Sequence, residues 1–226
     1  MNKLKIGILA VTTEGASKAF KDLNNAFYKE YGKYNNPEVL MYMQPLIDHV
    51  KSFGDEDVWL ELVQSGVDQL VDGGASLIWM PANSSHLVVD QVDFRGTKFV
   101  NMVEESSQLL STEKERTLVL GTSVSMSDRL YFKEADANPN LIRLSHEEQA
   151  ALDKIILDEL ILGFISEGSR HFIQRTIQSY QERGVRKMFF ACTELPCFFD
   201  KNEFSIATND SICVSIDKII KQSVVV

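Results

Sequence analysis

The chain has 226 residues, of which 44% are hydrophobic and 24% are charged, and this composition excludes disordered and fibrous proteins. Its formal net charge of -9 and pI near 5.0 argue against a surface that neutralises the phosphates of a nucleic acid. A small anionic ligand is not excluded, because helix N-termini and single Arg or Lys side chains create local positive fields.

Neither the start of the chain nor its cysteines indicate export or a membrane. The apolar run Ile6–Val11 ends before Thr12 and is shorter than the apolar region of a secretory signal. No apolar stretch is long enough to span a bilayer. The three cysteines, Cys192, Cys197 and Cys213, cannot all pair and lack metal-ligand spacing. We therefore expect reduced thiols, no metal and a cytoplasmic protein.

Short apolar runs bounded by polar or turn residues predict buried strands. In chain order they are Lys5–Ala10, Val39–Met43, Ser76–Met80, Lys98–Val100, Thr117–Leu120, Leu141–Leu144, Lys187–Phe190 and Phe204–Ile206. Amphipathic segments between them predict helices at Ser17–Tyr31, Asp57–Val71, Val103–Leu110, Ser125–Ala135, Glu147–Leu162, Arg170–Glu182 and Asp210–Lys221. Because strand and helix alternate, we predict an α/β fold with parallel sheets flanked by helices on both faces.

The chain contains a weak internal repeat. Gly74 precedes the run that leads to Ala82, and Gly184 precedes the run that leads to Cys192. The two glycines are 110 residues apart, and so are Ala82 and Cys192. Each half therefore presents a strand end followed by a turn rich in hydroxyl groups. The alternative is that two generic strand-turn-helix units produce the same spacing.

A second pair of strand ends supports the repeat within one residue. Ala10 closes the first predicted strand and Gly121 closes the Thr117–Leu120 strand, 111 residues later. We predict two pseudo-symmetric lobes, with residues 1–104 and 205–226 in the first and residues 105–204 in the second. Ligands of open α/β sheets bind outside the carboxyl ends of the strands, so we expect one active site between the lobes.

The turn at Cys192 places a thiol directly after an apolar strand and before a predicted helix start. Backbone N–H groups and the helix dipole lower the pKa of such a cysteine from about 8.5, so we expect a functional thiol; a buried, inert thiol is the alternative. Thr193 is expected to cap the helix or bind a carboxylate, and Glu194 suits the first helical turn. Cys197 is interpreted as a core residue and Cys213 as a helix residue that faces the sheet.

The corresponding turn, Pro81–His86, contains no thiol but is rich in groups that bind carboxylates. Asn83 and Ser84 offer an amide and a hydroxyl, and they can also cap the following helix. His86 lies four residues past Ala82, about one helical turn along the same face. We expect it to support the site, although a structural histidine is the alternative.

Four parts of the chain resemble the aspartate/glutamate racemase family. Pro81–His86 and Cys192–Pro196 are similar to its two signature turns, P-C-N-T-x-H and G-C-T-E. Leu120–Met126 with Tyr131 is similar to its L-G-T-x-x-T-M…Y segment, and Asp158–Gly163 to its E-L-x-x-G helix. The likeness extends from the first strand to the end of the second turn, and the Cys192 turn is its most specific part.

The resemblance implies racemisation of an acidic amino acid without pyridoxal phosphate or metal, in a homodimer. It implies two cysteines on opposite faces of the substrate Cα, one removing the proton and the other returning one. By this resemblance Cys192 is one of the two, and Ala82 occupies the position of the other. A methyl group cannot transfer a proton, so we expect the chain to be inactive or impaired as a racemase. Further departures from the family pattern are Ser84 for threonine and a first turn, Ala10–Thr13, without glycine.

Removal of a Cα proton also needs preorganised donors for the developing negative charge of the carboxylate. Our candidates are Asn83, Ser84, Thr122, Ser123 and Thr193, with Glu194 in the same substrate-binding set and Thr12 in a supporting role. A distal carboxylate requires a cation, for which Arg170 is the candidate; a surface charge is the alternative.

Alanine at position 82 leaves three interpretations open. In the first interpretation, it is an engineered substitution in an ordinary racemase. In the second, it is natural in a single-cysteine lyase, decarboxylase or one-sided isomerase of the same superfamily. In the third interpretation the chain is a non-catalytic protein that binds a carboxylate.

Overall fold

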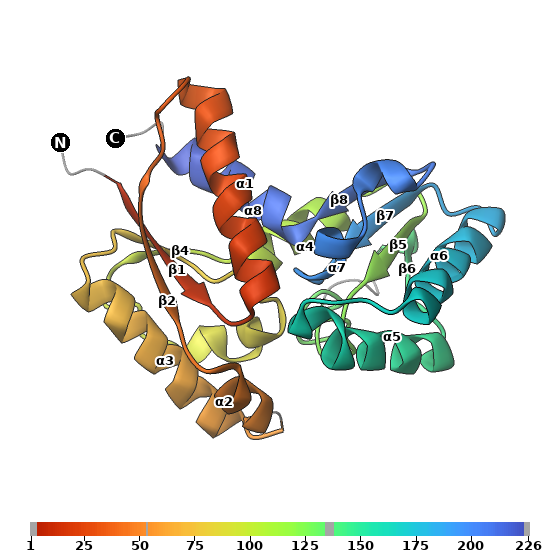
Figure 1. Ribbon diagram of the computed structural model, residues 1–226, viewed down its shortest axis with the longest axis horizontal. Helices are drawn as coiled ribbons and strands as arrows, with labels where there is room; N and C mark the ends of the chain where they lie inside the picture. Colours follow the sequence, from red (N-terminus) through yellow and green to blue (C-terminus); the bar gives the residue numbers. More distant parts are fainter. Residues whose placement is uncertain (1–3, 53, 134–137, 224–226) are drawn as a thin grey trace. The chain divides into compact units, whose positions relative to one another are not determined.

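The computed structural model describes residues 4–52, 54–133 and 138–223 and divides into two compact units (Figure 1). The first unit consists of Met1–Met102 and Ile212–Val226, and the second of Val103–Ser211. In the structure the chain thus returns to the first unit at Ile212, whereas the predicted division placed this return at residue 205.

Each unit contains one four-stranded parallel sheet. The first has the order β2-β1-β3-β4 and the second the order β6-β5-β7-β8. The strands are β1 (Lys5–Ala10), β2 (Glu38–Met43), β3 (Leu77–Trp79), β4 (Lys98–Val100), β5 (Thr117–Leu120), β6 (Leu141–Ile142), β7 (Lys187–Phe190) and β8 (Ala207–Asp210). Both sheets place their four strands in the same order relative to the chain. The predicted α/β fold of two pseudo-symmetric parallel sheets is therefore confirmed.

Helices cover both faces of the first sheet because its strand residues alternate between two cores. Ile8 and Trp79 pack on one face with helices α1 (Thr13–Tyr31) and α8 (Ser211–Ser223). Leu9 and Ile78 pack on the other face with helix α3 (Glu56–Asp72) and the 3-10 helix η1 (Ser84–Gln91). Alternate side chains of a strand point to opposite faces, so α1 and α3 lie on opposite sides of the sheet (Figure 1).

The second sheet is built in the same way. Leu120 and Phe190 pack against helices α5 (His146–Asp158) and α6 (Glu167–Glu182), while Phe189 contacts the ring of Tyr131, 6.0 Å between centroids. The remaining helical segments are α2 (Leu46–Lys51), α4 (Met102–Ser111), η3 (Leu160–Leu162), α7 (Leu195–Phe198) and η4 (Lys201–Glu203).

Two predicted elements are wrong. The strand predicted at Phe204–Ile206 lies three residues later, in the more polar segment Ala207–Asp210, while Phe204 and Ile206 pack against the core from the preceding connection. The helix predicted at Ser125–Ala135 is a series of turns over residues 125–133, and residues 134–135 lie outside the described part. Its backbone bonds have mixed spacing, from Ser127 N–H to the Val124 carbonyl and from Tyr131 N–H to the Ser125 carbonyl, so no helical repeat forms.

The glycines that revealed the repeat occupy equivalent positions. Gly74 and Gly184 follow α3 and α6 with φ of 83° and 92°. In both cases the next amide, of Ala75 or Val185, donates to the carbonyl five residues earlier at 3.0 Å. This arrangement closes a helix with a left-handed residue, which only glycine adopts at little cost. The repeat predicted from spacing thus corresponds to the same helix-to-strand connection in both units.

The first strand of each unit is also followed by the same cap. The Thr12 hydroxyl accepts from the Gly15 amide at 3.3 Å, and the Thr122 hydroxyl accepts from the Ser125 amide at 3.2 Å. These threonines are 110 residues apart, as are the preceding strand ends, Ala10 and Leu120. Val11 and Gly121 therefore occupy equivalent positions, and the predicted pairing of Ala10 with Gly121 was one residue out of register.

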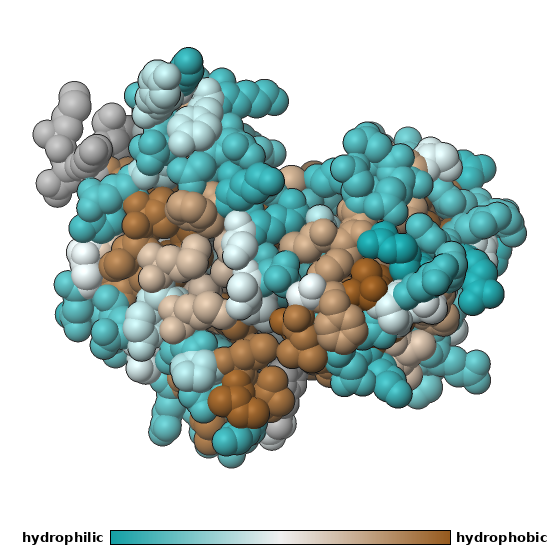
Figure 2. All heavy atoms as spheres, in the orientation of Figure 1, coloured by the Kyte–Doolittle hydropathy of each residue, from teal (hydrophilic) through white to brown (hydrophobic). Residues whose placement is uncertain are grey.

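Helix α2 was not predicted because its pattern is weak. His49 is its buried residue, while Ile47 and Val50 are 54% and 42% exposed, and Figure 2 shows apolar atoms gathered over this helix. A six-residue helix with apolar side chains on its solvent side lacks the periodicity that identifies an amphipathic helix. Within the described ranges, no helix is long and apolar enough to cross a membrane.

The two connecting glycines generate a prediction about stability. Gly74→Ala and Gly184→Ala are each expected to reduce the free energy of unfolding by about 1–2 kcal/mol, because an L-residue is strained at positive φ. Around Gly184 no atom lies within 4 Å of an added Cβ, so the cost is conformational. Urea unfolding measures it.

The matched control is Gly168→Ala, near the start of α6, where an added Cβ also meets nothing within 4 Å. It is expected to be neutral or to stabilise by up to about 1 kcal/mol. Equal destabilisation by all three substitutions would contradict the assignment.

Candidate functional site

The turn after β7 holds a buried thiol next to a buried carboxylate. The Cys192 Sγ donates to Glu194 Oε2 at 3.2 Å, and the Thr193 hydroxyl donates to Glu194 Oε1 at 3.0 Å. All three residues are 5% exposed or less. Cys192, Thr193 and Glu194, which were predicted as site residues, therefore form one hydrogen-bonded group at the carboxyl end of β7.

The predicted effect of this turn on the thiol has the wrong sign. Burial raises the pKa of Cys192 well above its ordinary value, and the Glu194 carboxylate raises it further. The backbone amides of Glu194 and Leu195 do lower the pKa, as expected for a helix start, but their effect is smaller. The resting thiol is therefore protonated at neutral pH. The cause is desolvation, which favours the uncharged form.

Glycine at position 121 lets the β5 turn approach the cysteine turn closely. The Ala191 amide donates to the Leu120 carbonyl at 2.7 Å, and a Cβ on Gly121 would lie 2.5 Å from the Ala191 carbonyl oxygen. Real side chains do not tolerate such a contact. A glycine is thus required for Cys192 to lie where it does.

The turn that carries Thr122 and Ser123 is anchored on α5. The Ser123 amide donates to the Asp153 carboxylate at 2.8 Å, and the Gln149 amide donates to the Gly121 carbonyl at 2.9 Å. The Thr122 hydroxyl caps the following turn, while Ser123 is exposed. Both candidate donors lie at the carboxyl end of β5, next to the strand that ends in the Cys192 turn.

Sequence reasoning missed Asp210, which lies at the carboxyl end of β8. Its carboxylate is fully buried and pairs with the Lys201 ammonium at 3.0 Å. Its register partner on β7 is Phe190, two residues before Cys192. Tyr131 interacts electrostatically with both Asp210 and Cys192, and burial raises its pKa. A correct boundary for β8 would have identified Asp210 as a strand-end residue.

The turn after β3 in the first unit is also largely buried. Asn83 and His86 are 5% and 4% exposed, whereas Ala82 and Ser84 are half-buried. Asn83 has helical dihedral angles and makes no capping bond through its side chain. The alternative interpretation of Asn83 as a helix cap is therefore wrong, and its amide remains a candidate for substrate binding.

His86 contacts the backbone of the residue that interrupts the racemase pattern. Its Nδ1 lies 2.9 Å from the Ala82 carbonyl oxygen, so Nδ1 carries the proton. Its ring lies 5.9 Å from that of Phe99, and Nε2 makes no hydrogen bond with the described residues. Burial lowers the pKa of His86 from 6.5 to about 4. A histidine that stays neutral at pH 7 is suited to holding the Ala82 turn rather than to donating a proton.

Arg170 and Glu159 have structural partners. The Arg170 guanidinium lies 3.5 Å from the Glu203 carboxylate and 5.0 Å from the ring centre of Phe199. The Glu159 carboxylate accepts from Ser166 N–H and the Ser169 hydroxyl, both at 2.6 Å, and thus holds the start of α6. No described contact joins Arg170 to the Cys192 turn.

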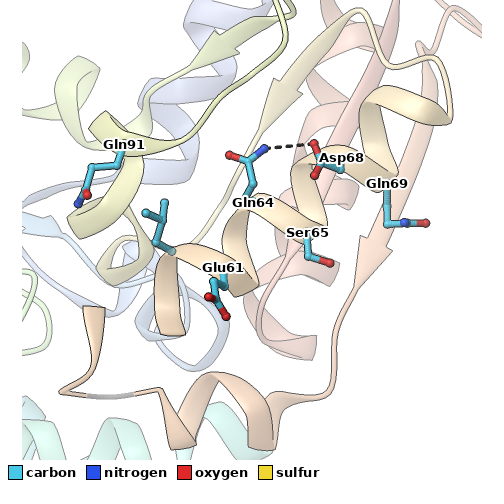
Figure 3. A pocket seen from close by; sticks show the side chains of 7 residues that line it. Glu61, Gln64, Ser65, Asp68, Gln69 and Gln91 are labelled. Carbon is cyan, nitrogen blue, oxygen red and sulfur yellow. Dashed lines mark hydrogen bonds between the residues drawn. The ribbon is translucent and has the colours of Figure 1, made fainter. Parts of the chain in front are cut away.

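A shallow hollow of about 430 Å³ lies along α3 (Figure 3). Gln64 lines it, hydrogen-bonded to Asp68 at 3.1 Å, and Gln91 of η1 borders it. None of the predicted site residues lines this hollow. The described residues include no group of three or more His, Cys, Asp or Glu side chains placed to hold a metal ion.

Known proteins of similar sequence and structure are amino-acid racemases. The chain is 24% identical over 215 residues to the broad specificity amino-acid racemase RacX of Bacillus subtilis (strain 168), covering 91% of this chain and 92% of that protein. It is similar to the Picrophilus torridus aspartate racemase with a TM-score of 0.82 and 20% identity, covering 97% and 94% of the two chains. It is also similar to the Francisella tularensis glutamate racemase in complex with D-glutamate, with a TM-score of 0.70 and 12% identity over 98% and 81%. Comparison with known family profiles finds no match.

Two parallel sheets of equal strand order with polar turns at their carboxyl ends define a two-unit α/β fold. The likeness to the Picrophilus torridus aspartate racemase shows that the two proteins share this fold. Within this fold the resemblance to aspartate/glutamate racemases that the two turns indicated is confirmed by both comparisons.

His86 generates a prediction about pH. Because its pKa is depressed to about 4 in the folded protein, the folded chain binds fewer protons than the unfolded chain between pH 6.5 and 4. Its contribution to stability is complete above pH 6.5 and is lost as the pH falls towards 4, by about 3 kcal/mol for the full shift. Urea unfolding at intervals from pH 7.5 to 4.5 measures the loss.

The control is His86→Phe, which keeps an aromatic ring beside Phe99 but does not titrate. The variant is expected to lose less stability than the parent over the same pH range, whatever its stability at pH 7.5. Parallel pH curves for the two proteins would show that His86 is not the group responsible.

Proposed function

We propose that this chain is an aspartate/glutamate racemase-like protein that binds an acidic amino acid and exchanges its Cα proton at Cys192. The observation that carries the proposal is the buried thiol-carboxylate contact at the end of β7, in a chain with the fold of aspartate and glutamate racemases. The structural neighbour bound to D-glutamate supports a carboxylate amino acid as the ligand class.

The proposed chemistry takes place at one sulfur. The Cα–H bond breaks, the proton moves to the Cys192 sulfur, and the electron pair is delocalised into the adjacent carboxyl group. Return of a proton from the same sulfur restores the same enantiomer. Donors near the carboxyl group stabilise the developing charge, and Asn83, Ser84 and Ser123 remain the candidates for this role.

Alanine at position 82 makes the proposed exchange one-sided. Its methyl group has no proton to donate, so a proton lost to Cys192 is not replaced from the opposite face. We therefore propose that the chain exchanges the Cα proton without efficient racemisation. A single-cysteine lyase, decarboxylase or isomerase would use the same asymmetry, with Cys192 as the proton donor to a carbanion. A non-catalytic carboxylate-binding protein would show neither reaction.

Two other expectations remain predictions. The resemblance implies a homodimer, and cysteines that form no disulfide within the described residues are typical of a cytoplasmic protein. The mass in solution and the cellular location of a tagged chain test them directly.

The proposed function predicts deuterium incorporation without racemisation. In D₂O, the chain is expected to replace the Cα proton of one enantiomer of aspartate or glutamate, as followed by proton NMR, while circular dichroism of the amino acid stays constant. Cys192→Ser is expected to lower the exchange rate by roughly 100-fold or more, since it removes the acid/base group. Cys213→Ser, on α8, is the matched control and should leave the rate unchanged.

Ala82→Cys tests the second thiol. Gain of racemisation in this variant, and its loss on adding Cys192→Ser, is expected if the two turns form a two-thiol site. No exchange by the parent and no racemisation by Ala82→Cys, on any of the four enantiomers, would contradict the proposed function. Carbon dioxide release from a malonate-type acid by the parent chain would instead favour the decarboxylase.

A further inference from the structure

The Glu194 carboxylate is directed at the thiol and not at an open site. One of its oxygens accepts from the Cys192 sulfur at 3.2 Å and the other from the Thr193 hydroxyl at 3.0 Å. The side chain is only 5% exposed. Both oxygens are therefore engaged within the turn.

This geometry disfavours the sequence-based role of Glu194 in substrate binding. A carboxylate carries only acceptors, so it repels the carboxylates of an acidic amino acid and complements only its ammonium group, and both Glu194 oxygens already accept within the turn. The carboxylate complements a group that donates a proton, and the group it contacts is the Cys192 thiol. The role of Glu194 is thus to be sought in the chemistry of the sulfur.

The carboxylate next to the thiol affects where the proton of Cys192 can go. In this turn a thiol and a carboxylate share one hydrogen-bonded proton. Losing that proton to solvent would leave two like charges 3.2 Å apart in a buried place, which is strongly unfavourable. Moving the proton from the sulfur to the carboxylate leaves the net charge unchanged, so it avoids this cost.

We propose that Glu194 is the proton partner of Cys192. The Glu194 carboxylate helps to keep the resting thiol protonated, and it takes the thiol proton when the sulfur must act as a base. The proposal rests on the proposed function and states how the Cys192 sulfur becomes a base. Glu194 acts through Cys192 and is a positioning residue rather than one that touches the substrate.

The step balances within the turn and the substrate. The S–H bond of Cys192 breaks as an O–H bond forms at Glu194 Oε2, which gives a thiolate beside a neutral carboxylic acid. The thiolate then removes the Cα proton, and the electron pair of the Cα–H bond passes into the substrate carboxyl group. In reverse, the Cys192 thiol returns a proton to Cα and the Glu194 proton returns to the sulfur.

Tyr131 is a further titratable group that interacts with the Cys192 sulfur. Tyr131 stays neutral because burial raises its pKa, and Asp210, which interacts with it, is paired with Lys201 at 3.0 Å. The Cys192 sulfur donates its hydrogen bond to Glu194, at 3.2 Å. Burial raises the pKa of the Cys192 thiol most, and the charge of Glu194 is the next largest cause.

The first test is the pH profile of thiol reactivity, which needs no substrate. The full chain is treated with methyl methanethiosulfonate between pH 6 and 11. Modification of Cys192 is followed by tandem mass spectrometry, which separates it from Cys197 on the same tryptic peptide. Glu194→Gln removes the negative charge and is expected to shift the midpoint for Cys192 down by at least about one pH unit. Glu194→Asp keeps the charge and should leave the midpoint above that of Glu194→Gln.

The control is Glu115→Gln, which neutralises an exposed carboxylate of the same unit and should not move the midpoint. Circular dichroism of each variant confirms that it is folded. An unchanged midpoint in folded Glu194→Gln would overturn the proposal, since the carboxylate would then not hold the proton of the thiol.

The second test is Cα deuterium incorporation by the same variants. Glu194→Gln is expected to lower the exchange rate by roughly 100-fold, although its thiol ionises more readily. A merely structural role would not lower the exchange rate and ease thiol ionisation at the same time. A lowered midpoint with exchange at the parent rate would overturn the role as proton acceptor. If the parent chain exchanges no acidic amino acid, the proposed function fails, while the shift of the midpoint still decides whether Glu194 keeps the thiol protonated.

Discussion

The close approach of two backbones at the carboxyl end of the second sheet positions the Cys192 thiol. Parallel pairing of β5 and β7 brings Gly121 against Ala191, at a distance that no side chain on residue 121 would permit. Ala191 is fully buried and its amide bonds to the Leu120 carbonyl at 2.7 Å, so the backbone that leads into Cys192 is held against β5. The position of the thiol follows from the packing of the sheet, and the polar contacts around it follow from that position.

Burial at this position changes the chemistry of the cysteine. A helix start offers amide donors that favour a thiolate, but here desolvation and the neighbouring Glu194 carboxylate favour the neutral thiol more strongly. The balance between these effects depends on the solvent that reaches the sulfur. In this position the neutral thiol is favoured, and the proposed role of Glu194 is to accept its proton.

The two units use one backbone plan for different chemistry. Strand order, the left-handed glycine before β3 or β7, and the threonine cap after β1 or β5 recur in both. In the first unit the turn after β3 carries Ala82, with its carbonyl bound by a neutral His86. In the second unit the equivalent turn carries Cys192 with a carboxylate. Similar folding of the halves therefore coexists with an asymmetric distribution of acid/base groups.

The alternating apolar pattern and the 110-residue spacing determined the class of fold, the repeated unit and the Cys192 turn, because strand burial and left-handed glycines are local requirements. The boundary of β8 was decided only by the tertiary structure, since Ala207–Asp210 is polar and becomes a strand by pairing with β7. Tertiary structure also decided the sign of the Cys192 pKa shift and the partners of Arg170, because desolvation and ion pairing depend on neighbours distant in the chain.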